Sequence, residues 1–220
     1  MANSLNRFEE EIGTAVFDSG RVSFGEVLWH VHRAHPELEL PPAPIFIDLG
    51  ALPPELVIKI GENLHRKAVQ ENIRFERVAG VPTGGNGFAE AFCMVDQGNT
   101  SRLLTLQKEG QRILGPVQGF YQPHNIVLPV EDVITTGAST LEAIEVFGAE
   151  NCIVHDVMAV IDYELGAAQR LKTDDLTLHR IFPISQLLGL WLEKKRITMG
   201  QYDKVMAVLN TIRTKLMPSS

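Results

Sequence analysis

Apolar positions along the chain switch between helical spacing and short continuous runs, which predicts helices separated by strands. Leu5, Phe8 and Ile12 recur at intervals of three and four residues, so a first amphipathic helix is expected there. Pro54 opens another helix, because proline suits the first helical turn and an apolar stripe at helical spacing follows it. Further helices are expected at 88–95, 139–147, 184–193 and 198–216.

The apolar runs between these helices have the length of strands, and 108–123 reads as a glycine- and glutamine-rich, loop-like segment with possible short strands. Strands that alternate with helices predict an α/β fold, with a mostly parallel twisted sheet and helices on both faces. The length suits a single domain, 1–220. The expected strands lie at 27–31, 45–49, 78–81, 103–106, 126–130, 152–161 and 176–181.

The segment 126–141 carries the most specific pattern. Its apolar run leads into the adjacent acids Glu131 and Asp132 and then into a hydroxyl- and glycine-rich turn that opens a helix. Carboxylates at a strand end can bind vicinal hydroxyls or a magnesium-bound sugar. The turn from Thr135 to Ser139 offers backbone N–H groups, and the helix after it adds roughly half a positive charge at its start. Together these features suit a phosphate with a ribose beside it.

A purely structural reading of the same segment stays open. Ser139 and Glu142 fit a capping box, which would use the serine hydroxyl to begin the helix. Pro129 cannot donate a ladder hydrogen bond, so it is expected to mark a bulge or the last paired residue of its strand. The alternative is therefore an ordinary strand-to-helix loop with a surface acid pair. A glycine-rich loop at 82–87 weakens it, since ligands of parallel sheets bind at the strands' carboxyl ends.

Charge and composition narrow the class of partner. A formal charge of −7 and the lack of an arginine-lysine stripe argue against nucleic-acid binding, so an anionic substrate needs a locally positive pocket. Cys93 and Cys152 lie in apolar settings and read as buried thiols of a reducing compartment. The polar N-terminus and the lack of an apolar run near ~20 residues argue against a signal peptide and a membrane span. A cytoplasmic location is expected.

The segment 126–141 resembles the phosphoribosyl pyrophosphate (PRPP) motif of the type I phosphoribosyltransferases, and orotate phosphoribosyltransferase is the most similar member. The resemblance extends over roughly 24–214, with similar segments at 44–49, 78–85, 108–109 and 160–166 in the family's order. It implies a type I phosphoribosyltransferase core with a small hood contributed by about 1–50 and 176–220.

The resemblance also implies the reaction. The expected enzyme, a pentosyltransferase, forms a nucleotide 5′-monophosphate and pyrophosphate from PRPP and a free base, with orotate favoured, in pyrimidine biosynthesis. It implies a homodimer and a Mg²⁺ ion bound mainly through PRPP or pyrophosphate. No residue of the chain is assigned as a metal ligand.

Residue roles follow from the same resemblance. Glu131 and Asp132 would hold the ribose hydroxyls, and Asp132 could help to offset the positive ring of the transition state. Lys108 would approach the leaving group as a catalytic residue, from the partner subunit. His30 and Tyr163 would lie at the base. Thr135, Thr136, Gly137, Ala138 and Ser139 would bind the 5-phosphate, and Thr83, Gly84 and Gly85 the pyrophosphate.

The chain lacks cations at several positions where the family has them. Tyr163 stands in place of a base-binding arginine, and Gly84 in place of a lysine. Losing one preorganised charge-stabilising donor typically costs about 2.7–4 kcal/mol, so two uncompensated losses would slow the reaction roughly 10⁴-fold. A same-fold transferase for another base, or a non-catalytic PRPP- or nucleotide-binding protein, therefore stays open. The other departures are Gln107, His30 and Gly50, where arginine, lysine and arginine are usual.

Three neighbouring histidines also allow a zinc reading. His30 and His32 would share one face of a strand at 27–31. No cysteine lies near them, and Pro36 breaks the geometry after His35. Pocket or surface histidines are therefore favoured over a metal site.

Overall fold

The computed structural model describes residues 5–96, 102–110 and 112–217. Its centre is a six-stranded sheet in the order β5-β4-β3-β6-β7-β8. Neighbouring strands run parallel except β5, which is antiparallel to β4. The predicted α/β fold with a mostly parallel sheet is confirmed. The strands are β3 (Arg77–Gly80), β4 (Leu103–Glu109), β5 (Arg112–Gln118), β6 (Val127–Ile134), β7 (Asp156–Asp162) and β8 (Thr177–Pro183).

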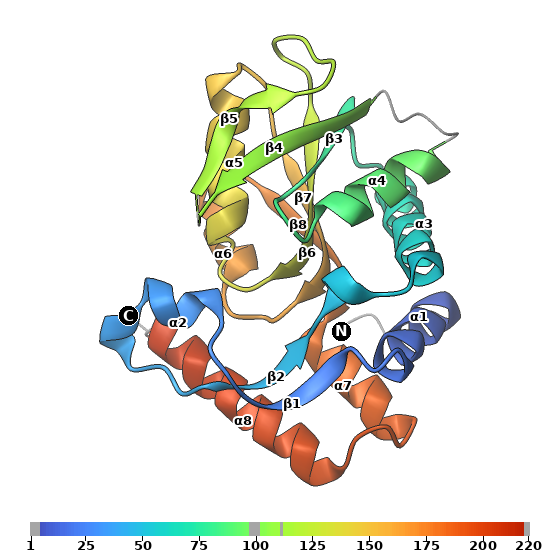
Figure 1. Ribbon diagram of the computed structural model, residues 1–220, viewed down its shortest axis with the longest axis vertical. Coiled ribbons are helices and arrows are strands. Elements are labelled where there is room, and N and C mark those ends of the chain that lie inside the picture. Colours follow the sequence, from blue (N-terminus) through green and yellow to red (C-terminus); the bar gives the residue numbers. More distant parts are fainter. Residues whose placement is uncertain (1–4, 97–101, 111, 218–220) are drawn as a thin grey trace.

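Helices cover both faces of this sheet (Figure 1). Val78 packs into the core beside α3 and α4, whereas the next residue, Ala79, packs into the cluster that contains α5 residues. Burial on both faces explains why the central strands read as continuous apolar runs. One face carries α3 (Pro54–Gln70) and α4 (Asn86–Val95), and the other α5 (Ala138–Ala149) and α6 (Ala167–Thr173), a short helix absent from the sequence prediction.

A smaller layer, which we call the hood, lies beyond one end of the sheet (Figure 1). Within it β1 pairs antiparallel with β2, and α8 packs against β2. Since β8 belongs to the central sheet, the C-terminal part of the hood begins at Ile184, later than the expected boundary near 176. The hood contains α1 (Arg7–Asp18), β1 (Val22–Val27), α2 (His30–Ala34), η1 (Pro36–Leu38), β2 (Ala43–Ile47), η2 (Leu49–Ala51), α7 (Ile184–Glu193) and α8 (Met199–Leu216).

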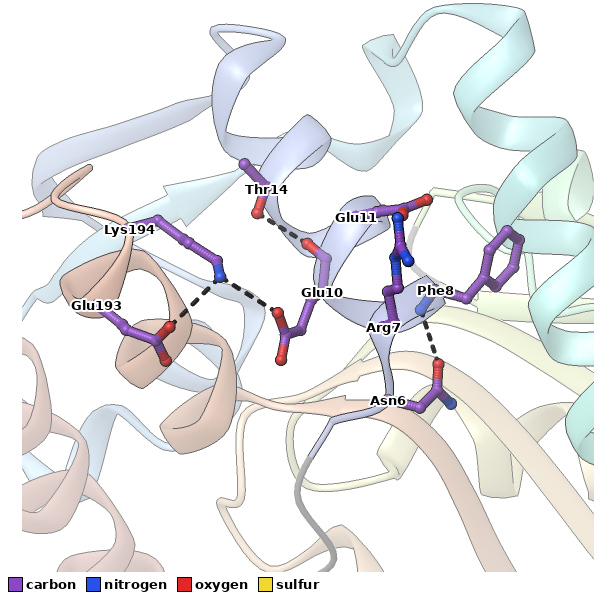
Figure 2. Close-up of polar contacts among 8 residues, drawn as sticks. All are labelled: Asn6, Arg7, Phe8, Glu10, Glu11, Thr14, Glu193 and Lys194. Carbon is purple, nitrogen blue, oxygen red and sulfur yellow. Dashed lines mark hydrogen bonds and ion pairs between the residues drawn. The ribbon is translucent and has the colours of Figure 1, made fainter.

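Contacts between α1 and α7 join segments from the two ends of the chain. The indole Nε1 of Trp191, a fully buried side chain, donates a 2.7 Å hydrogen bond to the carbonyl of Gly13. At the rim, Lys194 Nζ lies 3.2 Å from Glu10 Oε2 and 3.3 Å from Glu193 Oε1 (Figure 2). Burial of the indole and this ion cluster fix α1 against α7. Among the described residues, no helix has both the length and the apolar composition needed to cross a bilayer.

The segment 27–31, expected to be extended, instead turns into a helix. β1 ends at its first residue, and α2 begins at His30. The ring of His32 accepts a 3.0 Å hydrogen bond at Nδ1 from the N–H of Trp29, and its Nε2 lies 2.9 Å from the Pro41 carbonyl. This contact with a segment further along the chain is not visible in local periodicity. Because His30 and His32 share no strand face, the basis of the zinc reading is removed.

Pro129 lies inside β6, where the neighbouring strand accommodates it. Ile126 pairs with Ile153, and Val130 pairs with Met158, so the β7 side has one residue more between the two pairs. An extra residue on one side of a ladder is a bulge, and it lies where the missing N–H of proline would otherwise be needed. The bulge expected at Pro129 is confirmed, and it explains why β7 begins later than the predicted 152.

The segment 108–123, expected to be loop-like with possible short strands, contains the end of β4 and the whole of β5. Lys108 pairs with Ile113, and Glu109 pairs with Arg112, so the two strands form an antiparallel hairpin. Position 111 lies outside the described residues. Over its described residues, the loop that the resemblance implies as catalytic is thus a paired β-hairpin, which confirms the possible short strands.

Candidate active site

A cavity of about 510 Å³ lies at the carboxyl ends of β3, β6 and β7, with hood segments on its other side. Most of the predicted site residues meet there, although they come from four separate segments. Gly85 and Lys108 lie nearby but do not line it. The predicted residues on its wall are Glu131, Asp132, Thr135, Thr136, Gly137, Ala138, Ser139, Thr83, Gly84, His30 and Tyr163.

The turn between β6 and α5 leaves its helix start without a side-chain cap. Gly137 is the N-cap residue of α5, and its φ of 76° lies in the left-handed region that favours glycine. No side chain in the described part of the chain caps this end, so the capping box expected from Ser139 and Glu142 is wrong. Ser139 lines the cavity instead. Backbone N–H groups at such a helix start are well placed to bind an anion.

Both acids of the motif lie within β6 rather than after it, so their side chains leave the strand on different sides. Glu131 faces α5, where Thr140 Oγ1 donates a 3.0 Å hydrogen bond to Glu131 Oε2. Glu131 is only 7% exposed. Burial raises the pKa of its carboxyl well above the ordinary value, and the nearby charge of Asp132 raises that pKa further. Glu131 therefore lines the cavity at a position where burial makes its charged form energetically unfavourable.

Asp132 lies against the glycine-rich loop that follows β3. A β-carbon built on Gly84 would lie 2.0 Å from Asp132 Oδ2, and one built on Gly85 would lie 2.1 Å from the carbonyl oxygen of Val130. These approaches explain why two glycines stand here, since any side chain would displace the end of β6 or its carboxylate. Burial raises the pKa of Asp132, although backbone hydrogen bonding at Val133 opposes that shift. The Pro82–Thr83 peptide bond that opens this loop is cis.

Lys108 lies beside this glycine-rich loop of its own chain. Its Nζ is 3.3 Å from the carbonyl oxygen of Pro82, where the loop begins. Burial is the largest influence on the pKa values of Glu131 and Asp132 and raises both, while the positive charge of Lys108 acts in the opposite direction. Lys108 is thus close to the acids of its own subunit, whereas the resemblance led us to expect it over a partner's site.

The hood forms the other end of the cavity with two aromatic side chains in contact. The rings of Trp29 and Tyr163 meet edge to face with centroids 4.4 Å apart. Tyr163 is 2% exposed, and burial, with a smaller contribution from the charge of Asp132, raises the pKa of its hydroxyl. Tyr163 therefore stays neutral and forms part of a wall.

Sequence reasoning missed several residues of this cavity. Thr140 was not singled out, although a hydroxyl one turn into a helix is a common partner for a nearby acid. Arg33 lies three residues after His30, but the spacing carries meaning only once the segment is known to be helical. The missed polar and aromatic residues on the wall are Trp29, Arg33, Phe46, Asp48 and Thr140.

Known proteins provide an independent comparison. No family model matches the chain. It is 31% identical over 172 residues to an orotate phosphoribosyltransferase of Caenorhabditis elegans, a match that covers 76% of this chain and 74% of the relative. It is 30% identical over 185 residues to the uridine 5′-monophosphate synthase of the same organism, covering 79% of this chain.

That second match covers 36% of the relative, so the chain spans about a third of the synthase's length. Among solved structures, the UMP synthase of Leishmania donovani gives a TM-score of 0.78 at 25% identity, covering 93% of this chain and 43% of that one. The fold, the order of the motifs and the identity to a relative of similar length agree. The chain belongs to the orotate phosphoribosyltransferase family.

Proposed function

We propose that the protein transfers the phosphoribosyl group of PRPP to orotate, forming a nucleotide 5′-monophosphate and pyrophosphate for pyrimidine biosynthesis. One observation carries the proposal: an uncapped helix start, an acid pair and a glycine-rich loop open into the same cavity. These elements suit, in turn, a phosphate, ribose hydroxyls and pyrophosphate. The names of the relatives, orotate phosphoribosyltransferase and uridine 5′-monophosphate synthase, support orotate as the base.

The residues divide the work of the reaction by position. Backbone N–H groups at the start of α5 would bind the 5-phosphate, and the carboxylates of Glu131 and Asp132 would accept hydrogen bonds from the ribose hydroxyls. Asp132 would also stabilise the positive charge that develops on the ribose ring as pyrophosphate leaves. Lys108, next to the loop at Pro82, would approach the negative charge of the leaving group. Hood residues on the other side of the cavity would exclude water from the reacting centre.

Mg²⁺ would accompany PRPP and pyrophosphate rather than occupy a site made by the chain alone. The cavity offers carboxylate oxygens, which Mg²⁺ prefers, and Asp132 lies next to the loop assigned to pyrophosphate. When bound, the ion neutralises charge on pyrophosphate. We also propose the homodimer implied by the resemblance and a cytoplasmic location, which the two buried free thiols, Cys93 and Cys152, support.

A PRPP- or nucleotide-binding protein without turnover is the second candidate. It is favoured by the neutral, buried Tyr163 and by Gly84, where cations were expected. Incubating the protein with PRPP, Mg²⁺ and a panel of bases, and following pyrophosphate release, separates the two. Release with orotate in preference to other bases is expected. Tight PRPP binding without release for any base would support the second candidate.

Asp132→Asn is the matched variant for this experiment. It should abolish most turnover and weaken PRPP binding, because a neutral amide replaces the negatively charged carboxylate that would accept hydrogen bonds from the ribose hydroxyls. The melting temperature should not fall, because burial already makes the charge of Asp132 unfavourable in the unliganded protein. Lost stability with intact PRPP affinity would show that Asp132 is structural.

A further inference from the structure

The base end of the cavity has two basic side chains. Once the phosphate, ribose and pyrophosphate positions are assigned, the remaining wall comes from Tyr163 and from hood residues of 27–33 and 46–50. Among the described residues on that wall, His30 and Arg33 are the basic ones, and Asp48 is an acid. The basic side chains that could bind the carboxylate of a base therefore come from the hood.

The fold of α2 directs His30 and Arg33 to the same place. Residues three apart in a helix are neighbours on one face. The residues between them point elsewhere: Val31 is 2% exposed in the core, and the ring of His32 is held by the backbone of Trp29 and Pro41. These contacts fix the rotation of α2, so that the face with His30 and Arg33 is the one left for the cavity.

Arg33 is also free to bind an anion. No ion pair or hydrogen bond joins its guanidinium to any described residue. By contrast, Arg180 and Arg196 are each paired with an aspartate, Asp162 and Asp18. A guanidinium presents paired donors that match a carboxylate in a bidentate way, which a histidine or tyrosine cannot do.

The charges around the cavity make such a cation necessary for an anionic base. Glu131, Asp132 and Asp48 all line the cavity, so the carboxylate of orotate would meet acids on several sides. Tyr163 can donate one neutral hydrogen bond only. A guanidinium, unlike an imidazole, carries its positive charge over the whole physiological pH range, so Arg33 is the basic residue of this wall that suits a carboxylate best.

We propose that Arg33 on α2 binds the carboxylate of the base and replaces the arginine that the family carries at the position of Tyr163. The inference rests on the proposed function, because it takes orotate as the base. It means that the hood, rather than the end of β7, discriminates a carboxylated pyrimidine from a neutral one. His30 lies on the same face of α2 as Arg33 and lines the same wall.

The test compares two nucleotides that differ only in the base carboxylate, orotidine 5′-monophosphate and uridine 5′-monophosphate. Their dissociation constants are measured by calorimetry at pH 7.5. The two constants should differ roughly ten- to hundredfold, which is the size of a charge-assisted hydrogen-bonding contribution. Wild type should prefer the carboxylated nucleotide. Arg33→Ala should lose that preference while its affinity for uridine 5′-monophosphate is unchanged, which shows that the variant is folded.

Arg33→Lys should keep part of the preference, and His30→Ala should keep most of it. Arg7→Ala, which removes an exposed arginine of α1, is the control and should bind both nucleotides as wild type does. A wild type without preference, or an Arg33→Ala variant that retains it, would overturn the inference. Because binding needs no turnover, failure of catalysis is separate. A preference that depends on Arg33 in a protein that releases no pyrophosphate would refute the proposed reaction and leave this inference standing.

Discussion

Gly84 lies so close to Asp132 that a β-carbon at position 84 would come within 2.0 Å of the aspartate Oδ2. The loop after β3 and the end of β6 are therefore packed through a contact that only glycine permits. A lysine at this position, as the family often has, would have to move the carboxylate that we assign to the ribose. The departure at Gly84 is thus a consequence of how this chain positions Asp132.

Gly84→Ala should therefore weaken PRPP binding, by about tenfold or more, because the added methyl group displaces the carboxylate that accepts the ribose hydroxyls. Isothermal titration of PRPP with Mg²⁺ measures this. Gly148→Ala is the control: Gly148 lies on α5 with nothing within 4 Å of a β-carbon, so binding should stay unchanged. PRPP affinity equal to wild type in Gly84→Ala would show that Asp132 does not touch the ribose.

The sequence predicted those parts of the fold and site whose causes are local. The helices expected from Pro54 and at 198–216 appear where the pattern placed them, since caps and periodicity act within a few residues. The second one begins with a capping box between Thr198 and Gln201. Central strands were found because burial on both faces makes them uniformly apolar. The turn between β6 and α5 was predicted because its glycine and hydroxyl residues are contiguous in the sequence.

Features set by distant contacts could not be predicted in this way. The helix α2 depends on His32 reaching Pro41, so the face that carries Arg33 was hidden. The bond from Thr140 to Glu131 depends on how α5 returns over β6. At 108–123 only possible short strands were expected, because the glycine- and glutamine-rich composition does not show that β5 pairs with β4.

Glu131→Gln should stabilise the unliganded protein at neutral pH. Burial raises the pKa of Glu131, so the folded state favours the protonated carboxyl. The stability that this protonation contributes is lost as pH rises from the ordinary pKa near 4.5 through the raised pKa of the folded state. The neutral amide avoids the cost, about 1–3 kcal/mol for a buried group. Melting temperatures from pH 4 to 8 should show a gain for Glu131→Gln at pH 8 that shrinks toward pH 4.

The PRPP affinity of the same variant should fall about tenfold or more. The neutral amide accepts a weaker hydrogen bond from the ribose hydroxyl than the charged carboxylate does. Glu145→Gln, an exposed acid of α5, is the control and should change neither quantity. Equal melting curves for Glu131→Gln and wild type at pH 8 would mean that the carboxylate is solvated, against the burial described above.

Lys108→Ala should lower kcat by roughly 10²–10³-fold while the KM for PRPP changes little, as expected for a charge that acts mainly on the leaving group. Because Lys108 lies beside Pro82 of its own chain, the loss should not be complemented by a neighbour. Mixing Lys108→Ala with Asp132→Asn subunits tests this. If Lys108 served a partner's site, hybrid dimers would contain one intact site and recover activity; we expect none.

His179 joins two acids from different elements, and the cluster should determine how the fold responds to acid. Its Nδ1 contacts Glu71 at the end of α3, and its Nε2 lies 2.7 Å from Asp156 Oδ1 on β7. Lys67 Nζ lies 2.7 Å from Glu71 Oε1. Burial alone would raise the pKa of Glu71, but the hydrogen bonds from Lys67 and His179 outweigh it and hold that pKa below the ordinary value of 4.5.

An acid whose pKa is lowered by folding stabilises the fold at pH values above its unfolded-state pKa, near 4.5. That stabilisation is lost as pH falls through the folded-state pKa. Glu71→Gln should therefore lower the melting temperature at pH 7 by no more than a few degrees, because solvent screening of this partly exposed carboxylate limits its effect to about 1 kcal/mol or less. The deficit should shrink as pH falls below about 4.5, where wild type also loses the charge. Thermal denaturation across pH 3–7, with Glu145→Gln as the control, measures both. A deficit that stays constant over that range would assign the role of Glu71 to packing rather than to its charge.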